Sequence, residues 1–168
     1  MVINFSNEPI VLDKNSIFLA GPTVRGGRFE DSWRKKACFI LGNLNYNGRV
    51  YVPEYYNEEW STTDKDAYLK QCLWERSALM GAGVILFYFD RHFPELPALT
   101  TNVEFGMYLT KKPEQCVVCI PEGSNKNKYI EWLYEEETHS QHIFNPIARN
   151  LEDGLYVCTK IVSRICKE

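Results

Sequence analysis

Three polar segments of this chain each follow an apolar run, and the third holds a carboxylate among apolar neighbours. In "TTNVEFGMY" at 100–108, Glu104 stands between Val103 and Phe105 and is followed by Gly106. Such neighbours are unusual for a solvated side chain, which favours a site facing Glu104 over bulk water. A carboxylate in that position can act as a nucleophile on an electrophilic carbon.

The segment "AGPTVRGGRFED" at 20–31 is rich in small residues. Glycines allow the backbone to approach a ligand closely, and the N-terminus of a following helix can receive an anion. Arg25 and Arg28 flank Gly26 and Gly27, and they could donate to phosphate or sugar oxygens. The spacing is neither that of a dinucleotide fingerprint nor that of an NTPase phosphate loop. A glycine-rich turn with solvated arginines explains the segment equally well.

A second carboxylate, Glu75, lies beside Trp74 in "QCLWERSALM", where an exposed helical glutamate is the simpler interpretation. The segment "GSNKNKYIEWL" at 123–133 carries amide and amine donors, which a solvated turn and helix cap also explains. The three histidines show no ligand spacing, so no metal site is expected. No Ser-His-Asp or Cys-His arrangement is present either.

The elements that position these segments alternate between strand and helix, which favours a parallel sheet covered on both faces. The expected fold is a doubly wound α/β domain, flavodoxin-like or Rossmann-like, with a parallel five-stranded sheet and helices on both faces. The segment before residue 16 could add an edge hairpin. The predicted strands are 16–21, 49–54, 83–89, 115–121 and a short fifth at 141–146, and the predicted helices are 29–44, 66–80, 102–112, 127–137 and 152–167.

Two of the predicted helices carry further expectations. Thr101 or Asn102 is a plausible cap for the helix at 102–112. That start places Glu104 in the first turn, where the helix dipole would help to hold it ionised by up to about 1 kcal/mol. In the helix at 66–80, one face is predicted to be apolar, and its members are Leu69, Cys72, Leu73, Leu79 and Met80.

Such a fold binds ligands beyond the carboxyl ends of its strands, where the strand order reverses. The loops after the first three central strands, "AGPTVRGGR", "PEYYNEEW" and "DRHFPELPALTTNVE", are therefore expected to meet at one crevice. Glu104 is the last residue of the longest of these loops.

Length and composition predict one domain over residues 1–168. The net charge of −3 argues against a protein that binds large nucleic acids through a basic face. No apolar run approaches the ~20 residues of a membrane span, and the N-terminus does not read as a signal peptide, so a cytoplasmic protein without a membrane partner is expected. The six cysteines, including "CVVC" at 116–119, are expected to be reduced and mostly buried.

Several motifs together carry a family resemblance. "SIFLAGP", "SWR", "VYVPE", "WE", "GVILFYF" and "TTNVEFGMYL" occur here in the order found in the nucleoside 2-deoxyribosyltransferase-like family, and "EGSNKNKYIEWL" extends the match. The chain resembles that family over residues 16–133. The resemblance implies chemistry at the anomeric carbon of a nucleoside or nucleotide, no cofactor, and a homodimer or higher homo-oligomer. Trp132, Tyr134 and Phe144 are candidate interface aromatics, although core packing explains them equally well.

The resemblance also implies roles for individual residues. Glu104 in "VEFG" matches the nucleophile that forms a glycosyl-enzyme, and Glu75 matches an acidic residue that contacts the base or assists its protonation. "GPTVRGGR" is similar to a substrate-binding loop of the nucleoside 5′-monophosphate N-glycosidases, which favours a phosphorylated substrate. Asn127, with Lys128, resembles the region that reaches the sugar 5′ end across a subunit interface. The substrate-binding candidates are Phe18, Gly21, Pro22, Arg25, Gly26, Gly27, Arg28, Trp74, Asn102 and Asn127.

The sequence departs from the family pattern at two places. Characterised transferases carry an Asp six residues before the nucleophile, where this chain has Ala98, and a frequent "AD" before the third strand is Ala82-Gly83 here. Transfer to a second base and hydrolysis by water therefore both remain open. So do hydrolysis of another ribosyl cofactor such as NAD, and nucleotide sensing without efficient catalysis.

Overall fold

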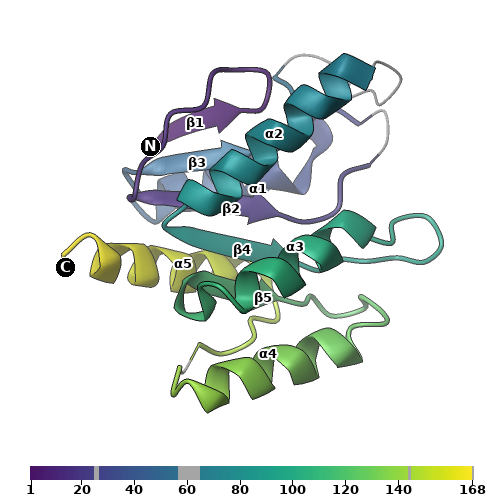
Figure 1. Ribbon diagram of the computed structural model, residues 1–168, viewed down its shortest axis with the longest axis vertical. Coiled ribbons are helices and arrows are strands. Elements are labelled where there is room, and N and C mark those ends of the chain that lie inside the picture. Colours follow the sequence, from purple (N-terminus) through teal and green to yellow (C-terminus); the bar gives the residue numbers. More distant parts are fainter. Residues whose placement is uncertain (25–26, 57–64, 144, 168) are drawn as a thin grey trace.

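Short runs of β-branched and aromatic residues form a parallel sheet at the centre of the molecule (Figure 1). The computed structural model describes residues 1–24, 27–56, 65–143 and 145–167. The sheet has five strands in the order β1-β3-β2-β4-β5, and all four pairings are parallel. The strands are β1 (Val2–Phe5), β2 (Ser16–Ala20), β3 (Arg49–Val52), β4 (Val84–Tyr88) and β5 (Cys116–Cys119).

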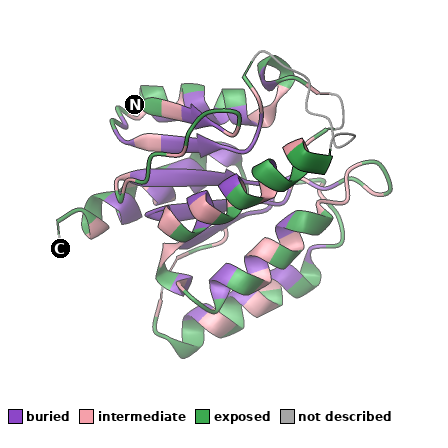
Figure 2. Cartoon of the chain, turned by 45° about the horizontal axis from the view of Figure 1, so that its top comes forward, coloured by how far each residue is buried: buried purple, intermediate pink, exposed green. Residues whose placement is uncertain are grey.

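Helices cover both faces of this sheet, so the predicted doubly wound α/β fold is confirmed. One apolar core packs α1 and α5 against the sheet, and the other packs α2, α3 and α4 against the opposite face. Figure 2 shows buried strands between helices that expose their outer sides. The helices are α1 (Trp33–Asn43), α2 (Lys65–Gly81), α3 (Leu99–Leu109), α4 (Lys128–Ser140) and α5 (Leu151–Ile165), with short 3₁₀ turns η1 (Phe29–Asp31) and η2 (Pro113–Gln115).

The two innermost strands explain the apolar runs in the sequence. Every residue of β2 and β4 is buried, as expected for strands covered on both faces. Their register pairs Ile17 with Val84 and Ala20 with Phe87, so both strands end at the same edge of the sheet. The loops that leave these ends are the two expected to form the crevice.

The fifth strand is not where the sequence placed it. Residues 141–143 and 145–146 form no strand, and His142 adopts a left-handed backbone (φ 58°) that interrupts an extended run. The edge position beside β3 is instead taken by β1, which pairs in parallel and not as a hairpin. On the other edge, Ala148 makes only an isolated bridge to Cys119.

Helix α2 turns a different side to the sheet than its leucines suggest. Leu69, Leu73 and Met80 are exposed, whereas Trp74 and Ala78 pack into the core. The prediction of one buried face holding Leu69, Cys72, Leu73, Leu79 and Met80 is therefore wrong except for Leu79. Sequence spacing defines a face of a helix, but it does not say which face meets the sheet.

Among the described residues, no helix has the length and apolar character needed to cross a membrane. The cysteines are free, and four of the six are buried. Cys116 and Cys119 lie inside β5, where burial raises the pKa of both thiols to about 12. These thiols therefore belong to the core, as the position of "CVVC" in a predicted strand indicated.

Candidate active site

A cavity of about 770 Å³ lies beyond the carboxyl ends of β2 and β4. The chain leaves β2 toward α1 on one face of the sheet and leaves β4 toward α3 on the other, so the cavity lies where the strand order reverses. Its volume is in the range of sites that hold small molecules. Four parts of the chain line the cavity. They are β2 and its loop (18 and 20–24), α1 and the residue after β3 (34 and 53), α2 (68, 71, 72 and 75), and the β4–α3 loop with α3 (92, 95–101 and 104).

Glu104 lines this cavity, but it does not lie in the first turn of its helix. Helix α3 begins at Leu99, so Glu104 is its sixth residue. The predicted caps, Thr101 and Asn102, lie inside the helix, and the N-cap position is held by Ala98 in a left-handed conformation (φ 52°) without a side-chain cap. The helix dipole acts mainly on the first turn, so the expected stabilisation of an ionised Glu104 does not apply.

The surroundings of Glu104 favour its protonated form. The pKa of its carboxyl group is raised to about 8, mainly by burial and also by the nearby charge of Glu75, while Arg34 opposes both. Glu104 forms no ion pair with any residue that the structure describes. Glu104 therefore lines the cavity without a cationic partner among the described residues.

Glu75 lines the same cavity from α2. It is mostly buried, so the exposed helical glutamate considered from the sequence is not what the structure contains. The side-chain N–H of Gln71, one helical turn earlier, donates to Glu75 Oε1 at 2.6 Å and to the carbonyl of Pro53 at 3.2 Å. Burial raises the pKa of Glu75, while the Gln71 hydrogen bond and Arg34 lower it. Gln71 therefore fixes the orientation of this second carboxyl group.

Arg34 is a site residue that the sequence reasoning did not identify. It is 1% exposed, and its guanidinium donates to the carbonyl oxygens of Leu19 (2.9 Å) and Gly21 (2.8 Å) and to Thr23 Oγ1 (3.0 Å). It also pairs with buried Glu54. The only signal was "SWR" among the family-like motifs, because charged residues are normally expected at the surface.

Gly21 and Pro22 line the cavity where the chain leaves β2. A Cβ on Gly21 would lie 2.7 Å from the Trp33 ring and 2.8 Å from the carbonyl oxygen of Tyr88, so only glycine fits there. The Trp33 indole N–H donates to the Pro22 carbonyl at 3.0 Å. Phe18 is buried in β2 and contributes to the cavity floor.

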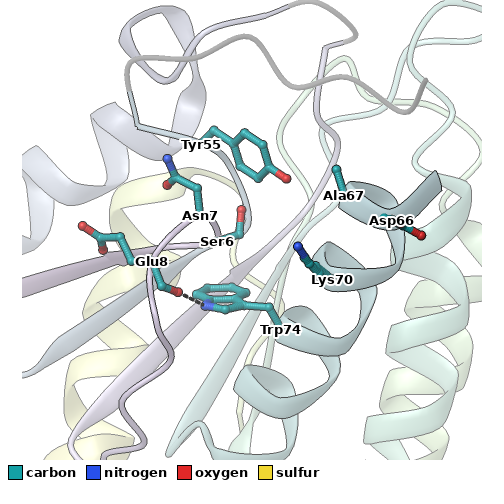
Figure 3. Close-up of a pocket in the computed structure, with 8 residues that line it drawn as sticks. All are labelled: Ser6, Asn7, Glu8, Tyr55, Asp66, Ala67, Lys70 and Trp74. Atoms are coloured by element: carbon teal, nitrogen blue, oxygen red, sulfur yellow. Dashed lines mark hydrogen bonds between the residues drawn. The ribbon is translucent and has the colours of Figure 1, made fainter. Parts of the chain in front are cut away.

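The remaining candidates do not line this cavity. Arg25 and Gly26 lie outside the described residues, and Gly27 and Arg28 are not part of the lining. Trp74 instead lines a smaller neighbouring cavity of about 380 Å³, where its indole N–H donates to the Glu8 carbonyl at 3.1 Å (Figure 3).

Two asparagines predicted to bind substrate have other partners. The side-chain oxygens of Asn102 and Asn127 accept hydrogen bonds from Arg91 at 2.9 and 2.7 Å. Neither asparagine lines the cavity. Of the candidate interface aromatics, Tyr134 is buried in the core, Trp132 is exposed, and Phe144 lies outside the described residues.

The two departures from the family pattern have different structural settings. Ala98 lines the cavity, so a longer polar side chain at this position would face the bound molecule. Gly83 precedes β4, where a Cβ would collide with the carbonyl oxygen of Lys14. The first departure changes the site, and the second follows from the packing of the chain before β2.

The geometry combines the carboxyl groups of Glu75, Glu95 and Glu104, one buried guanidinium and an apolar floor in a single cavity. No group of His, Cys, Asp and Glu that could hold a metal ion occurs in the part of the chain that the structure describes. A family model described as "Nucleoside 2-deoxyribosyltransferase like" matches residues 14–124, which is more than half of the chain. The matched range runs from just before β2 to the loop after β5 and contains every residue of the cavity lining. No curated protein matched the chain.

Proposed function

The chain belongs to the nucleoside 2-deoxyribosyltransferase-like family, and we propose that it cleaves or exchanges the N-glycosidic bond of a nucleoside or nucleotide with Glu104 as the nucleophile. The observation that carries this proposal is the presence of Glu104 and Glu75 in one cavity of nucleoside size. Retaining glycosyl transfer uses two carboxyl groups in this way, one as nucleophile and one as acid.

The first step forms a glycosyl-enzyme. A carboxylate oxygen of Glu104 attacks C1′, the bond from C1′ to the base nitrogen breaks, and its electron pair leaves with the base. Glu75, in its protonated form, delivers a proton to the departing base, because a base anion leaves poorly. The products are a free neutral base, a glycosyl ester on Glu104 and an ionised Glu75.

The second step releases the sugar from Glu104. A nitrogen of another base, or a water molecule, attacks C1′ while the ester bond to Glu104 breaks. The proton of the attacking group returns to Glu75, which restores the starting state. A base gives an exchanged nucleoside, and water gives the free sugar.

The electrostatics of the cavity favour one protonated and one ionised carboxyl group. Burial favours the proton on Glu104, so the proposed reaction begins once Glu104 is ionised and Glu75 carries the proton. The charge of Glu75 disfavours the ionisation of Glu104, and burial raises the pKa of both carboxyl groups. A pair that shares one proton holds one nucleophile and one acid at the same time. The Gln71 hydrogen bond occupies only Oε1 of Glu75, which leaves Oε2 available for the proton.

The covalent intermediate provides the direct test. A nucleoside with fluorine at C2′ destabilises the oxocarbenium-like transition state and slows release of the sugar. We expect a protease fragment that contains Glu104 to gain the mass of the fluorosugar in the wild type and not in Glu104→Gln. Glu95→Gln is the matched control, because Glu95 also lines the cavity. Labelling of Glu104→Gln, or turnover without any labelled fragment, would reject Glu104 as nucleophile.

Ala98 favours hydrolysis as the second candidate reaction. Characterised transferases of the family carry a carboxylate six residues before the nucleophile, and that position lines the cavity here. Nucleosides and 5′-monophosphates incubated with and without a second base separate the cases. An exchanged nucleoside identifies a transferase, free sugar alone identifies a hydrolase, and ligand-induced thermal stabilisation without product identifies a sensor.

We also propose a homodimer or larger homo-oligomer that covers the outward faces of α2 and α3. These faces expose large apolar side chains, and Tyr68 and Leu99 belong both to them and to the rim of the cavity, so a second copy seated there would close the cavity against water. Leu73→Glu and Val103→Glu should give monomers by sedimentation, whereas Phe39→Glu on α1 should not. A monomeric wild type at assay concentration would reject the proposal. The exposed residues are Tyr68, Leu69, Leu73, Met80, Leu99, Val103 and Met107.

A further inference from the structure

Arg91 is a buried arginine at the start of the β4–α3 loop, and the mechanism above does not use it. It is 3% exposed. Its Nε donates to Asn127 Oδ1 at 2.7 Å, its Nη1 to Asn102 Oδ1 at 2.9 Å, and its Nη2 to the Lys126 carbonyl at 2.8 Å. One guanidinium therefore joins the loop after β4, the first turn of α3 and the segment that begins α4.

Helix α3 depends on this contact because its N-terminus is poorly capped. Ala98, at the N-cap position, offers no side-chain acceptor, and the first backbone hydrogen bond, from the Asn102 N–H to the Ala98 carbonyl, is long at 3.3 Å. Ser, Thr, Asp or Asn would normally bond the first free N–H groups of a helix. The Arg91 bond to Asn102 therefore supplies an attachment that the capping position lacks.

The other end of the attachment is well anchored. Asn127 is buried at the N-cap position of α4 without a side-chain cap bond, and it donates from Nδ2 to Ser124 Oγ at 2.7 Å and to the Phe89 carbonyl at 3.4 Å. Phe89 follows β4 directly and is fully buried. The first turn of α3 is thus fastened, through Arg91, to the carboxyl end of a central strand.

Geometry and not charge explains why an arginine occupies this position. Its partners in these bonds are two side-chain amides and a carbonyl, and it forms no ion pair within the described ranges. Asn102 lies in the first turn of α3 and Asn127 holds the N-cap position of α4, and a helix N-terminus disfavours a cation. The planar fork of a guanidinium can reach three acceptors in fixed directions, which a lysine ammonium cannot.

We infer that Arg91 is a positioning residue that fixes the first turn of α3 and thereby the place of Glu104 in the cavity. Glu104 follows Asn102 by two residues on the same helix. This inference rests on the proposed role of Glu104 as nucleophile. A misplacement of about 1 Å at a reacting atom can cost on the order of 100-fold in rate, so a loose first turn would slow the chemical step.

The test uses Arg91→Lys and Asn102→Ala in the full chain. Both should lower kcat about 10- to 100-fold and change KM less than about 3-fold, because binding groups on β2 and α2 are untouched. Asn102→Asp keeps an oxygen acceptor for Arg91 and should retain kcat within about 3-fold. Arg164→Lys, at an exposed position on α5, is the matched control and should behave as wild type.

Amide hydrogen exchange measures the same attachment without any substrate. Residues 99–104 should exchange faster in Arg91→Lys and Asn102→Ala than in the wild type, while α2 keeps its protection. If the wild type has no glycosyl activity, the proposed function fails and exchange still tests the attachment. Unchanged exchange, or faster exchange with unchanged kcat, overturns the positioning role of Arg91. Should Arg91→Lys not fold, Asn102→Ala and Asn102→Asp decide the question by the same two measurements.

Discussion

Two buried arginines hold the two loops that border the cavity, and they differ in what surrounds them. Arg34 binds carbonyl oxygens at the end of β2 and just after it, and it is paired with the carboxylate of Glu54. Arg91 binds the β4–α3 side through the amides of Asn102 and Asn127. The charge of Arg34 lowers the pKa of both cavity carboxyl groups, whereas Arg91 acts through directional hydrogen bonds. One arginine thus influences ionisation in the cavity, and the other influences geometry.

The largest expected effect follows from removing the carboxyl group of Glu104, which both arginines are proposed to influence. Glu104→Gln keeps the shape of the side chain and removes the nucleophile, so kcat/KM for glycosidic cleavage should fall at least about 1,000-fold. Product formation measured by chromatography checks this, with Glu95→Gln expected within a few-fold of wild type. A Glu104→Gln variant with near-normal turnover would transfer the nucleophilic role to another residue.

The second prediction compares the two arginines in stability. Arg34→Met leaves Glu54 buried without its ion-pair partner and should lower the free energy of unfolding by about 3–5 kcal/mol. Arg91→Met leaves only neutral acceptors unpaired and should cost about 1–3 kcal/mol. Urea unfolding measures both values. Adding Glu54→Gln to Arg34→Met should recover part of the lost free energy of unfolding. Equal losses in Arg34→Met and Arg91→Met would contradict the view that only Arg34 neutralises a buried charge.

The third prediction concerns stability against pH. The pKa of Glu104 is raised to about 8 in the folded state, from an ordinary value of 4.5. Between these values the folded chain keeps a proton that the unfolded chain releases, so this contribution is lost as pH rises through 8. Glu104→Gln should therefore gain stability over wild type as pH rises from 4.5 to 8, by up to about 5 kcal/mol above pH 8, with the difference vanishing below pH 4.5. A difference independent of pH would contradict the raised pKa.

The smallest expected effect is a difference between Arg34 and Arg91 in the pH dependence of kcat/KM. The acid limb of kcat/KM should lie near pH 8, because Glu104 must be ionised to attack. The double variant Arg34→Met and Glu54→Gln removes the cation that favours an ionised Glu104. The acid limb of kcat/KM should therefore move to higher pH by less than about one unit. Arg91→Lys should lower kcat without moving the limb. A shifted limb in Arg91→Met, which removes the cation, would show that the charge of Arg91 reaches Glu104.

Several features were accessible from the sequence because they depend on local pattern. Apolar runs such as "GVILFYF" mark strands that are covered on both faces, and β2 to β5 lie where those runs predicted them. Glu104, Gly21 and Pro22 were expected at one crevice because parallel strands end together at one edge of a sheet, whereas Glu75 was a candidate only through the family resemblance.

Other features required the packed chain. The start of α3 was misplaced because Ala98 takes a left-handed conformation that its residue type does not announce. The inward face of α2 was misassigned because Leu69 and Leu73 are exposed, whereas Trp74 and Ala78 pack into the core. The strand expected at 141–146 was replaced by β1, whose short edge pairing with β3 leaves a weak pattern in the sequence.

By itself, the sequence determined the order of strands and helices and the segments from which a site could be built, because backbone propensity and apolar periodicity act over a few residues. Only the tertiary structure decided the electrostatic state of the carboxyl groups and the burial of Arg34 and Arg91. Burial, ionisation and hydrogen-bond partners depend on which distant segments meet. Residues as far apart as Arg91 and Asn127 become neighbours only once the sheet has brought its loops to one edge.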